Sequence, residues 1–300
     1  MSDAPPSYAG LWLPLVTPFK GGELDQGSLR RLVRAYAGRV DGLVLCATTG
    51  EAPALSANET QQVVEAAKDE LAAMGSATRI LIGLGGASTA GVVRALGQAE
   101  RWGGDGFLVT CPYYVRPSQE GLQLHFEAIA DATSADLLIY NIPYRTGVNL
   151  ANDTLLRIAE RTNVVGLKDC CADREQSRDL IRRKPAGFTV LMGDDAGFAD
   201  ALEDGADGGV TASAHLDPEG FMAAQRLAQS GRRAEIQEAW PGLAAIPDLL
   251  FAEPNPGPLK HCLWRMGLID SPELRLPMTP PSAGLAQRLD AALALRGAAG

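Results

Sequence analysis

Eight short apolar runs constrain the fold of this chain more than any other feature. They span residues 11–19, 42–47, 79–84, 106–112, 137–143, 164–169, 189–194 and 208–213, and longer stretches of helical pattern separate them. Near-continuous apolar strands joined by helices are typical of a parallel sheet whose faces are both covered. Eight strand–helix units, of roughly 20 to 35 residues each, predict the α/β class and a closed (β/α)8 TIM barrel.

The helical pattern is clearest in SANETQQVVEAAKDELAAM, residues 56–74. Val63, Val64, Ala67 and Leu71 recur there at the spacing of one helix face. Ser56 followed by Glu59 forms a capping-box sequence, so we expect the helix to begin beside Ser56.

The chain divides after the eighth strand and its helix. We expect a catalytic barrel over residues 1–230 and a C-terminal helical appendage over residues 231–300, because the tail has a helical pattern without a strand signal. The proline-rich stretches EPNPGP (253–258) and LRLPMTPPS (274–282) interrupt that pattern.

A doubly wound dinucleotide-binding sheet is the competing architecture. Its nearest signal is GLGG (83–86), where Ser88 stands in place of the third glycine of the G-x-G-x-x-G fingerprint. The sequence therefore favours the barrel.

Composition limits the partners of the protein. With 46% hydrophobic and 21% charged residues, the chain of 300 residues is of the ordered globular kind. Its formal net charge of −9, without a dense basic cluster, predicts no binding to nucleic acid or to anionic membranes. The first residues lack a basic segment followed by an apolar one, and no apolar run is long enough to span a bilayer. We expect a cytoplasmic protein whose partners are small-molecule substrates.

The cysteines and histidines give no metal signature. The five cysteines form no C-x-x-C pair, and the three histidines are far apart in the sequence. We expect reduced thiols, no metal and no cofactor.

Polar residues gather where the predicted strands end. In strand order they are Thr48, Thr49 and Glu51, then Tyr113 and Tyr114, then Tyr140 and Arg145, then Lys168, then Gly193 and Asp194, and finally Thr211 and Ser213. Active sites of (β/α)8 barrels lie at the C-terminal ends of the strands. These side chains are therefore expected to surround one site.

Lys168 is the reactive candidate in this set, because it lies in the apolar run VVGLKD (164–169). An unprotonated lysine amine can attack a ketone to form an imine, whose protonated nitrogen then accepts electrons and makes the neighbouring carbon nucleophilic. A lysine whose pKa falls by about three units is roughly half neutral at pH 7, at a free-energy cost of about 4 kcal/mol. Burial of an ammonium ion among apolar residues can impose that cost. Tyr140 is a candidate proton shuttle, and Thr48 and Thr49 are candidate donors to a substrate carboxylate.

An ordered series of motifs between Gly10 and Pro280 resembles the dihydrodipicolinate synthase family of pyruvate-dependent class I aldolases, which also include N-acetylneuraminate lyase. The motifs are TTGE (48–51), CPYYVRPSQEGLQLHF (111–126), YNIPYRTGV (140–148), GLKD (166–169), GDD (193–195), EPNPGPLK (253–260) and LRLPMTP (274–280).

The resemblance implies a set of roles. Lys168 would form the Schiff base with pyruvate, Tyr140 would act as the acid and base beside the imine, and Arg145 would bind the carboxylate of aspartate semialdehyde. The implied catalytic residues are Lys168, Tyr140, Thr48 and Tyr114, and the substrate-binding residues are Thr49, Arg145, Gly193 and Thr211. Tyr114 would reach the Thr48–Tyr140 relay from a neighbouring subunit, in a homotetramer or homodimer.

Two alternatives remain open at the level of sequence. Ala47 replaces the glycine usual before TTGE, and Tyr144 stands where a small residue is common, so a related aldolase or dehydratase acting on another 2-keto acid is the first alternative. A catalytically silent barrel that binds a keto acid is the second. A metal-dependent aldolase is disfavoured, since no histidine lies beside Glu51, Asp169 or Asp194.

The resemblance also bears on regulation. Lysine-inhibited members bind their effector through histidine, asparagine and glutamate side chains, where this chain has Ala57, Thr60, Ala87 and Gly91 and keeps only Tyr113. An ammonium-bearing effector would lose its anionic partner, so we expect weak or no feedback inhibition by lysine.

Overall fold

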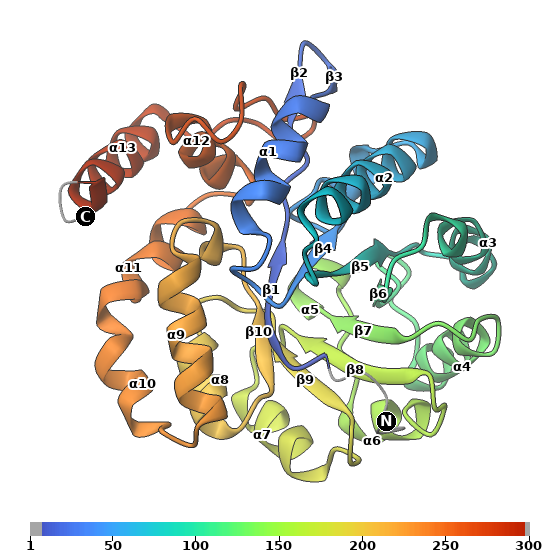
Figure 1. Cartoon of the computed structure of the whole chain (residues 1–300). Helices are drawn as coiled ribbons and strands as arrows, with labels where there is room; N and C mark the ends of the chain where they lie inside the picture. The colour runs from blue at the N-terminus through green and yellow to red at the C-terminus, as the bar shows by residue number, and fades with distance from the viewer. Residues whose placement is uncertain (1–7, 298–300) are drawn as a thin grey trace.

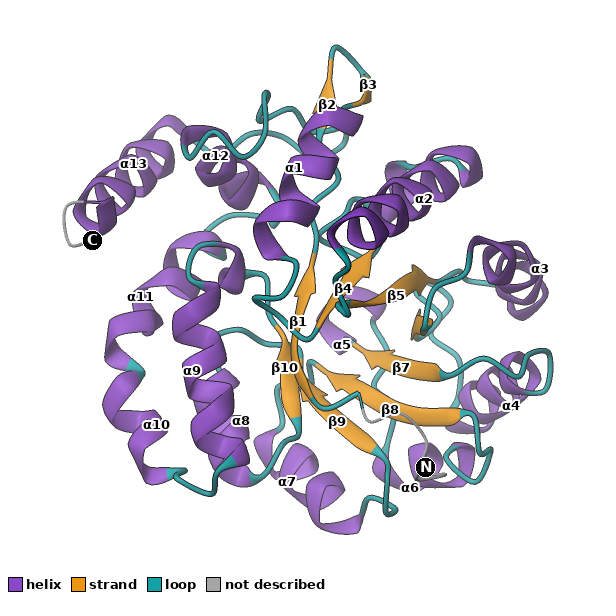
Figure 2. Ribbon diagram, viewed as in Figure 1, coloured by secondary structure: helices purple, strands orange, loops and turns teal. Residues whose placement is uncertain are grey.

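The computed structural model describes residues 8–297 and contains a closed barrel of parallel strands surrounded by helices (Figures 1 and 2). The barrel strands are β1 (Gly10–Pro14), β4 (Gly42–Leu45), β5 (Arg79–Leu84), β6 (Gly106–Thr110), β7 (Leu137–Asn141), β8 (Val164–Asp169), β9 (Thr189–Met192) and β10 (Gly208–Val210). Each strand pairs with its neighbours in chain order, and β10 closes the ring on β1. This confirms the predicted (β/α)8 barrel, and each of the eight apolar runs overlaps one of its strands.

Helices follow the strands along the chain. They are α1 (Gln26–Tyr36), α2 (Ala57–Met74), α3 (Thr89–Ala99), α4 (Gln119–Ala130), α5 (Pro143–Thr146), α6 (Asn152–Ile158), α7 (Arg174–Arg183), α8 (Phe198–Asp204) and α9 (Pro218–Gln229). Short 3-10 turns lie at Ala52–Ala54, Glu100–Trp102 and Ser213–His215. Helix α2 begins directly after Ser56, and the Ser56 and Glu59 side chains form both bonds of the capping box, as predicted.

The first strand is shorter than predicted. The run 11–19 was expected to be one strand, but β1 ends at Pro14, and Phe19–Lys20 (β2) instead pairs antiparallel with Glu23–Leu24 (β3). Pro14 and Pro18 lack the backbone N–H that a continuing parallel strand needs. The chain therefore leaves the barrel, and the Thr17 hydroxyl bonds the carbonyl of Gly50, 2.7 Å away.

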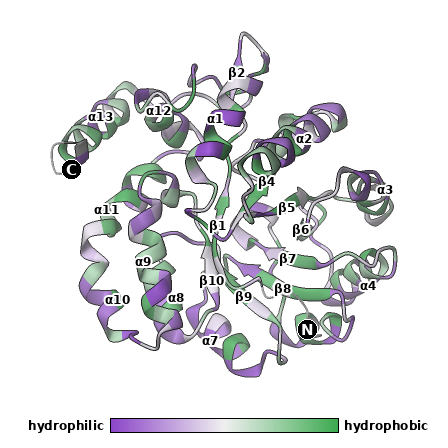
Figure 3. Ribbon diagram, viewed as in Figure 1, coloured by the Kyte–Doolittle hydropathy of each residue, from purple (hydrophilic) through white to green (hydrophobic). Residues whose placement is uncertain are grey.

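Two apolar layers hold the barrel. One cluster fills its interior and includes Trp12, Val44, Leu108, Leu138 and Leu191, and a larger one lies between strands and helices. Figure 3 shows hydrophobic strands β7 and β8 inside a ring of helices with mixed faces. Because the interior is packed with side chains, polar groups have room only near the ends of the strands.

The C-terminal region is helical, as expected, with α10 (Ala234–Ala239), α11 (Pro241–Leu250), α12 (Gly257–Arg265) and α13 (Ala283–Gly297). Helix α10 packs on α8 and α9, whereas α12 packs on α13 (Figure 1). The boundary at residue 230 between a barrel and an appendage stays a prediction. Within residues 8–297, every helix falls short of the length and apolar content needed to cross a membrane.

Candidate active site

Lys168 and Tyr140 lie side by side in the barrel interior. They are paired across β7 and β8, and both are almost fully buried, with 5% and 3% of their surfaces exposed. The Lys168 ammonium nitrogen, Nζ, lies 4.2 Å from the centroid of the Tyr140 ring. The lysine that the sequence singled out is therefore dry and in contact with the predicted phenol.

Burial is the main influence on the charge of Lys168 and lowers its pKa. Cys170 and Asp195 act in the opposite direction, and the Arg145 guanidinium lowers the pKa further. Burial also raises the pKa of the neighbouring Cys170 thiol to about 12, so this thiol is neutral at physiological pH. The site thus favours an uncharged amine, as imine formation requires.

The Tyr140 hydroxyl belongs to a short polar chain. Burial raises the pKa of Tyr140 well above its usual value, while a hydrogen bond with the half-buried Thr48 side chain and the charge of Arg145 act to lower it. A phenol that keeps its proton and shares it with a hydroxyl can pass protons between the barrel interior and the cavity.

Gly193 leaves room for the side chain of Lys168 because it has no Cβ atom. A Cβ atom at this position would lie 2.4 Å from Cys170 Sγ and 2.6 Å from Lys168 Cε, well inside van der Waals contact. The absence of a side chain at 193 therefore lets the lysine run along the end of β9. The structure gives Gly193 a packing role against Lys168, and its predicted contact with substrate stays a prediction.

Thr49 and Glu51 are held by the C-terminal region. The buried Thr49 hydroxyl accepts a 2.9 Å hydrogen bond from the Asn255 amide, and the buried Glu51 carboxylate pairs with the Lys260 ammonium, which is 0% exposed. Glu51 also accepts a 3.0 Å bond from the backbone N–H of Arg275. The role of Glu51, left open by the sequence, is to fasten the TTGE turn to the motifs EPNPGPLK and LRLPMTP.

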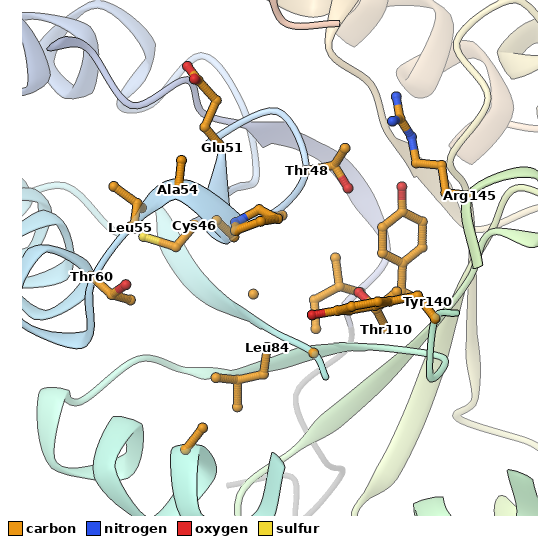
Figure 4. Close-up of a pocket in the computed structure, with 18 of the residues that line it drawn as sticks. Cys46, Thr48, Glu51, Ala54, Leu55, Thr60, Leu84, Thr110, Tyr140 and Arg145 are labelled. Atoms are coloured by element: carbon orange, nitrogen blue, oxygen red, sulfur yellow. The ribbon is translucent and has the colours of Figure 1, made fainter. Parts of the chain in front are cut away.

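A cavity of about 710 Å³ opens beside Tyr140. Figure 4 shows Thr48, Tyr140 and Arg145 on one side of it, and Ala54, Leu55 and Thr60 on the other. Of the eight predicted site residues, the cavity is lined by Thr48, Tyr114, Tyr140 and Arg145. Lys168, Thr49, Gly193 and Thr211 are not among the residues that line it.

Two of the predicted residues that line the cavity, Tyr114 and Arg145, are exposed at its rim. Tyr114 is 89% exposed and has a φ of 71°, an uncommon backbone conformation for a side chain of this size. The exposed Arg145 lies over the Tyr144 ring, 5.2 Å from its centroid, with Nε 3.3 Å from the Tyr144 hydroxyl. Tyr144, noted as a departure from the family pattern, thus supports the predicted carboxylate-binding arginine.

Ala47, the other departure from the family pattern, is buried. It lies opposite Gly83 of β5, where a Cβ would come within 2.9 Å of Ala47 Cα and 2.4 Å of the Cys46 carbonyl oxygen. The backbone at residues 46 and 47 therefore depends on the glycine at 83, whichever side chain stands at 47.

Thr211 is fully buried, and its hydroxyl has no hydrogen-bond partner among residues 8–297. Its predicted substrate contact stays a prediction. The part of the chain that the structure describes also contains no group of three or more His, Cys, Asp or Glu side chains arranged to hold a metal ion.

Sequence reasoning missed Asn255 and Lys260 as individual residues, although both lie in a motif that it identified. Lys260 lies among apolar residues of α12, as Lys168 does in β8. A lysine within an apolar segment was therefore the sequence feature that could have identified Lys260. It also missed Asp195, which follows the noted Gly193 and Asp194 and is 2% exposed.

The closed barrel and the buried lysine on its sixth strand are those of a class I aldolase-type barrel enzyme. The model of the dihydrodipicolinate synthetase family matches residues 7–295. A 4-hydroxy-tetrahydrodipicolinate synthase 2 of Clostridium acetobutylicum is 40% identical over 284 residues, covering 94% of this chain and 98% of the relative. The chain belongs to the dihydrodipicolinate synthetase family, which confirms the resemblance seen in its motifs.

Solved structures agree with this assignment. Dihydrodipicolinate synthase from Aquifex aeolicus has a TM-score of 0.92 at 32% identity, covering 97% of this chain and 98% of that one. Dihydrodipicolinate synthase from Acinetobacter baumannii, solved in complex with pyruvate, has a TM-score of 0.91 at 35% identity, covering 96% of this chain and 99% of that one.

Proposed function

We propose that this protein condenses pyruvate with aspartate semialdehyde to form 4-hydroxy-tetrahydrodipicolinate, through a Schiff base on Lys168. The observation that carries the proposal is the buried Lys168 amine 4.2 Å from the centroid of the Tyr140 ring, in a member of the dihydrodipicolinate synthetase family. Relatives that carry the name of this activity match along nearly their whole length.

The first step is addition of the neutral Lys168 amine to the ketone carbon of pyruvate. The ketone oxygen leaves as water, and the nitrogen takes up one proton to become a protonated imine. Loss of a methyl proton then gives an enamine, whose carbon attacks the aldehyde carbon of the second substrate. The amino group of that substrate then attacks the imine carbon, which closes the ring and releases the Lys168 amine. Tyr140 and Thr48 are the proposed carriers of the protons that these steps exchange, because both side chains lie on the same side of the cavity (Figure 4).

Carboxylate recognition is divided between two parts of the site. Thr48 and Thr49, in the turn that Asn255 and Glu51 hold in place, are the proposed donors to the pyruvate carboxylate. Arg145 at the rim is the proposed partner of the semialdehyde carboxylate, since a guanidinium can form two parallel hydrogen bonds with it. Gly193 and Thr211 complete the proposed binding set.

The proposed assembly is a homodimer or homotetramer in the cytoplasm, with Tyr114 completing the relay in a neighbouring subunit. Tyr113, Tyr114 and Val115 expose 43%, 89% and 52% of their surfaces on one loop, and Tyr114 and Arg116 both have positive φ. An exposed aromatic segment with a constrained backbone supports an interface between copies of the chain.

The test is turnover of pyruvate with aspartate semialdehyde by purified protein. Arg145→Ala is expected to raise the KM for the semialdehyde at least about tenfold, because it removes a charged contact, with capture of pyruvate unchanged. Arg157→Ala is the control, because Arg157 bonds Gln123 and Thr154 away from the cavity. Pyruvate capture without semialdehyde turnover would contradict the proposed second substrate and favour another aldehyde.

A further inference from the structure

Thr110 is a half-buried threonine at the C-terminal end of β6, and the proposed steps leave it unused. It pairs with Tyr140 across β6 and β7, as Tyr140 pairs with Lys168 across β7 and β8. Side chains paired across neighbouring parallel strands point to the same face of the sheet, and such strands lie about 4.8 Å apart. Because Tyr140 faces the barrel interior, Thr110, Tyr140 and Lys168 form one row across it.

The Thr110 side chain borders the open space of the cavity. It lines the cavity together with Tyr140, beside which Figure 4 labels it. Gly85, just after β5, lines the same space, and a Cβ there would lie 3.3 Å from Thr110 Cβ and 3.5 Å from its Oγ1. The absence of a side chain at 85 therefore leaves the Thr110 hydroxyl uncrowded on this side.

The Thr110 hydroxyl makes no hydrogen bond within residues 8–297. By contrast, Thr60, Thr146 and Asn255, which also line the cavity, are already hydrogen-bonded within the protein. A half-buried hydroxyl without a protein partner is satisfied by water or by a ligand. A valine would fill the same space without a polar group, so packing alone does not explain a hydroxyl at 110.

One polar atom of the two substrates has no partner in the function proposed above. Thr48 and Thr49 bind the pyruvate carboxylate there, and Arg145 binds the carboxylate of the semialdehyde. The aldehyde oxygen must lie close to the row that holds Lys168, because its carbon reacts with the enamine on that residue. Thr110 is the free donor in this row.

We propose that the Thr110 hydroxyl donates a hydrogen bond to the aldehyde oxygen of the second substrate while the new carbon–carbon bond forms. The proposal rests on the function proposed above. The electron pair of the enamine double bond forms the new bond, the Lys168 nitrogen becomes a protonated imine again, and the C=O electron pair moves to the oxygen. That oxygen takes up the proton released by the methyl group, through the proposed carriers Tyr140 and Thr48. A donor fixed on a barrel strand stabilises the developing negative charge without having to reorganise.

The test compares Thr110→Val, which removes the hydroxyl and keeps the shape, with Thr110→Ser, which keeps the hydroxyl. Thr110→Val is expected to lower kcat/KM for aspartate semialdehyde about tenfold or more, because it removes a donor to the developing charge. Thr110→Ser is expected to stay close to wild type. Thr60→Val, on the opposite side of the cavity from Tyr140 (Figure 4), is the control and should leave kcat/KM unchanged.

A second measurement separates the aldehyde step from the steps before it. Exchange of the pyruvate methyl protons in deuterium oxide, followed by NMR, needs the imine and the enamine but no aldehyde. Thr110→Val is expected to exchange these protons at the wild-type rate. Its unfolding midpoint is expected to be no lower than that of wild type, since no hydrogen bond within the protein is lost.

The outcomes distinguish this proposal from the function on which it rests. Wild-type kcat/KM in Thr110→Val, equal losses in Thr110→Val and Thr110→Ser, or equal slowing of exchange and turnover would overturn the role of the hydroxyl alone. Wild type that exchanges pyruvate protons without turning over the semialdehyde would overturn the second substrate and this proposal together. Absence of exchange in wild type would reject the Schiff-base function itself.

Discussion

Lys168 is held where its charged form is unfavourable, between the Tyr140 ring and the backbone at Gly193. Burial lowers its pKa below the ordinary value of 10.5. Between the folded-state pKa and 10.5, the unfolded chain binds more protons than the folded one, so stability rises with pH across this window. Below the window the penalty is fully present, and above it both states are neutral and the penalty is gone.

Lys168→Met is therefore expected to stabilise the protein at pH 7 while abolishing activity. The expected gain is about 1 to 3 kcal/mol, as for removal of a poorly compensated buried polar group. The gain shrinks as pH rises towards 10.5, because the wild type then no longer carries the charge. Urea unfolding at several pH values measures this difference. A variant less stable than wild type at pH 7 would show that the buried amine is well compensated.

The packing of Gly193 against Lys168 gives a second prediction at the scale of single residues. Gly193→Ala is expected to lower kcat at least about tenfold, since displacing a reacting group from its geometry costs more than one order of magnitude in rate. Gly197→Ala on the same loop is the control, because the nearest atom to its added Cβ is 3.6 Å away. Equal activity of the two variants would rule out close packing at 193 as a requirement.

At the scale of elements, the site depends on a contact between distant parts of the chain. The turn after β4 is joined to α12 and to the segment before α13 through Glu51, Lys260 and Arg275. The Lys260 ammonium also donates a 2.8 Å bond to the carbonyl of Glu273 and lies 4.3 Å from the centroid of the Phe19 ring. The C-terminal region therefore holds the two threonines of the candidate site in position.

Lys260→Met is expected to destabilise the protein by about 3 to 5 kcal/mol, because it leaves the Glu51 carboxylate buried without its partner. The double variant Glu51→Gln/Lys260→Met is expected to recover most of this loss, since no charge is then left unpaired. Arg232→Ala, which removes an exposed ion pair with Glu235, serves as the control and should leave the unfolding midpoint unchanged. Additive effects of the two buried substitutions would show that the pair does not act as a unit.

The strands were predictable from sequence because a parallel strand buried on both faces reads as a short apolar run. The end of the first strand was not predicted, because its apolar run continues to Phe19. Pro14 and Pro18 end the backbone hydrogen bonding of this strand earlier. Lys168 and Tyr140 were predictable because barrel sites gather at strand ends. The pairing of Glu51 with Lys260 was not, because the two residues are 209 positions apart and neither sequence neighbourhood indicates the other.

At the scale of the whole molecule, the cavity extends beyond the candidate site towards α2 and α3. There it is lined by Ala57, Thr60 and Tyr113 together with Leu84 and Trp102, and no carboxylate of α2 or α3 lines it. An amino-acid effector in this region would find apolar surface, hydroxyl groups and the Gln98 amide, and the one carboxylate among the lining residues, Glu51, is already paired with Lys260. The lining is consistent with the weak lysine feedback expected from the sequence.

Free lysine is therefore expected to leave turnover unchanged at micromolar concentrations. Steady-state rates at fixed pyruvate and semialdehyde, measured over a lysine titration, check this expectation. Inhibition in the micromolar range would reject it and would require a binding site formed by other residues.

The most direct measurement of the central claim is reduction of the protein with borohydride in the presence of pyruvate, followed by mass analysis of its peptides. The account predicts one stoichiometric adduct, located on Lys168 and absent in Lys168→Met. An adduct on another lysine, or a protein that turns over pyruvate and semialdehyde without any trapped adduct, would contradict it.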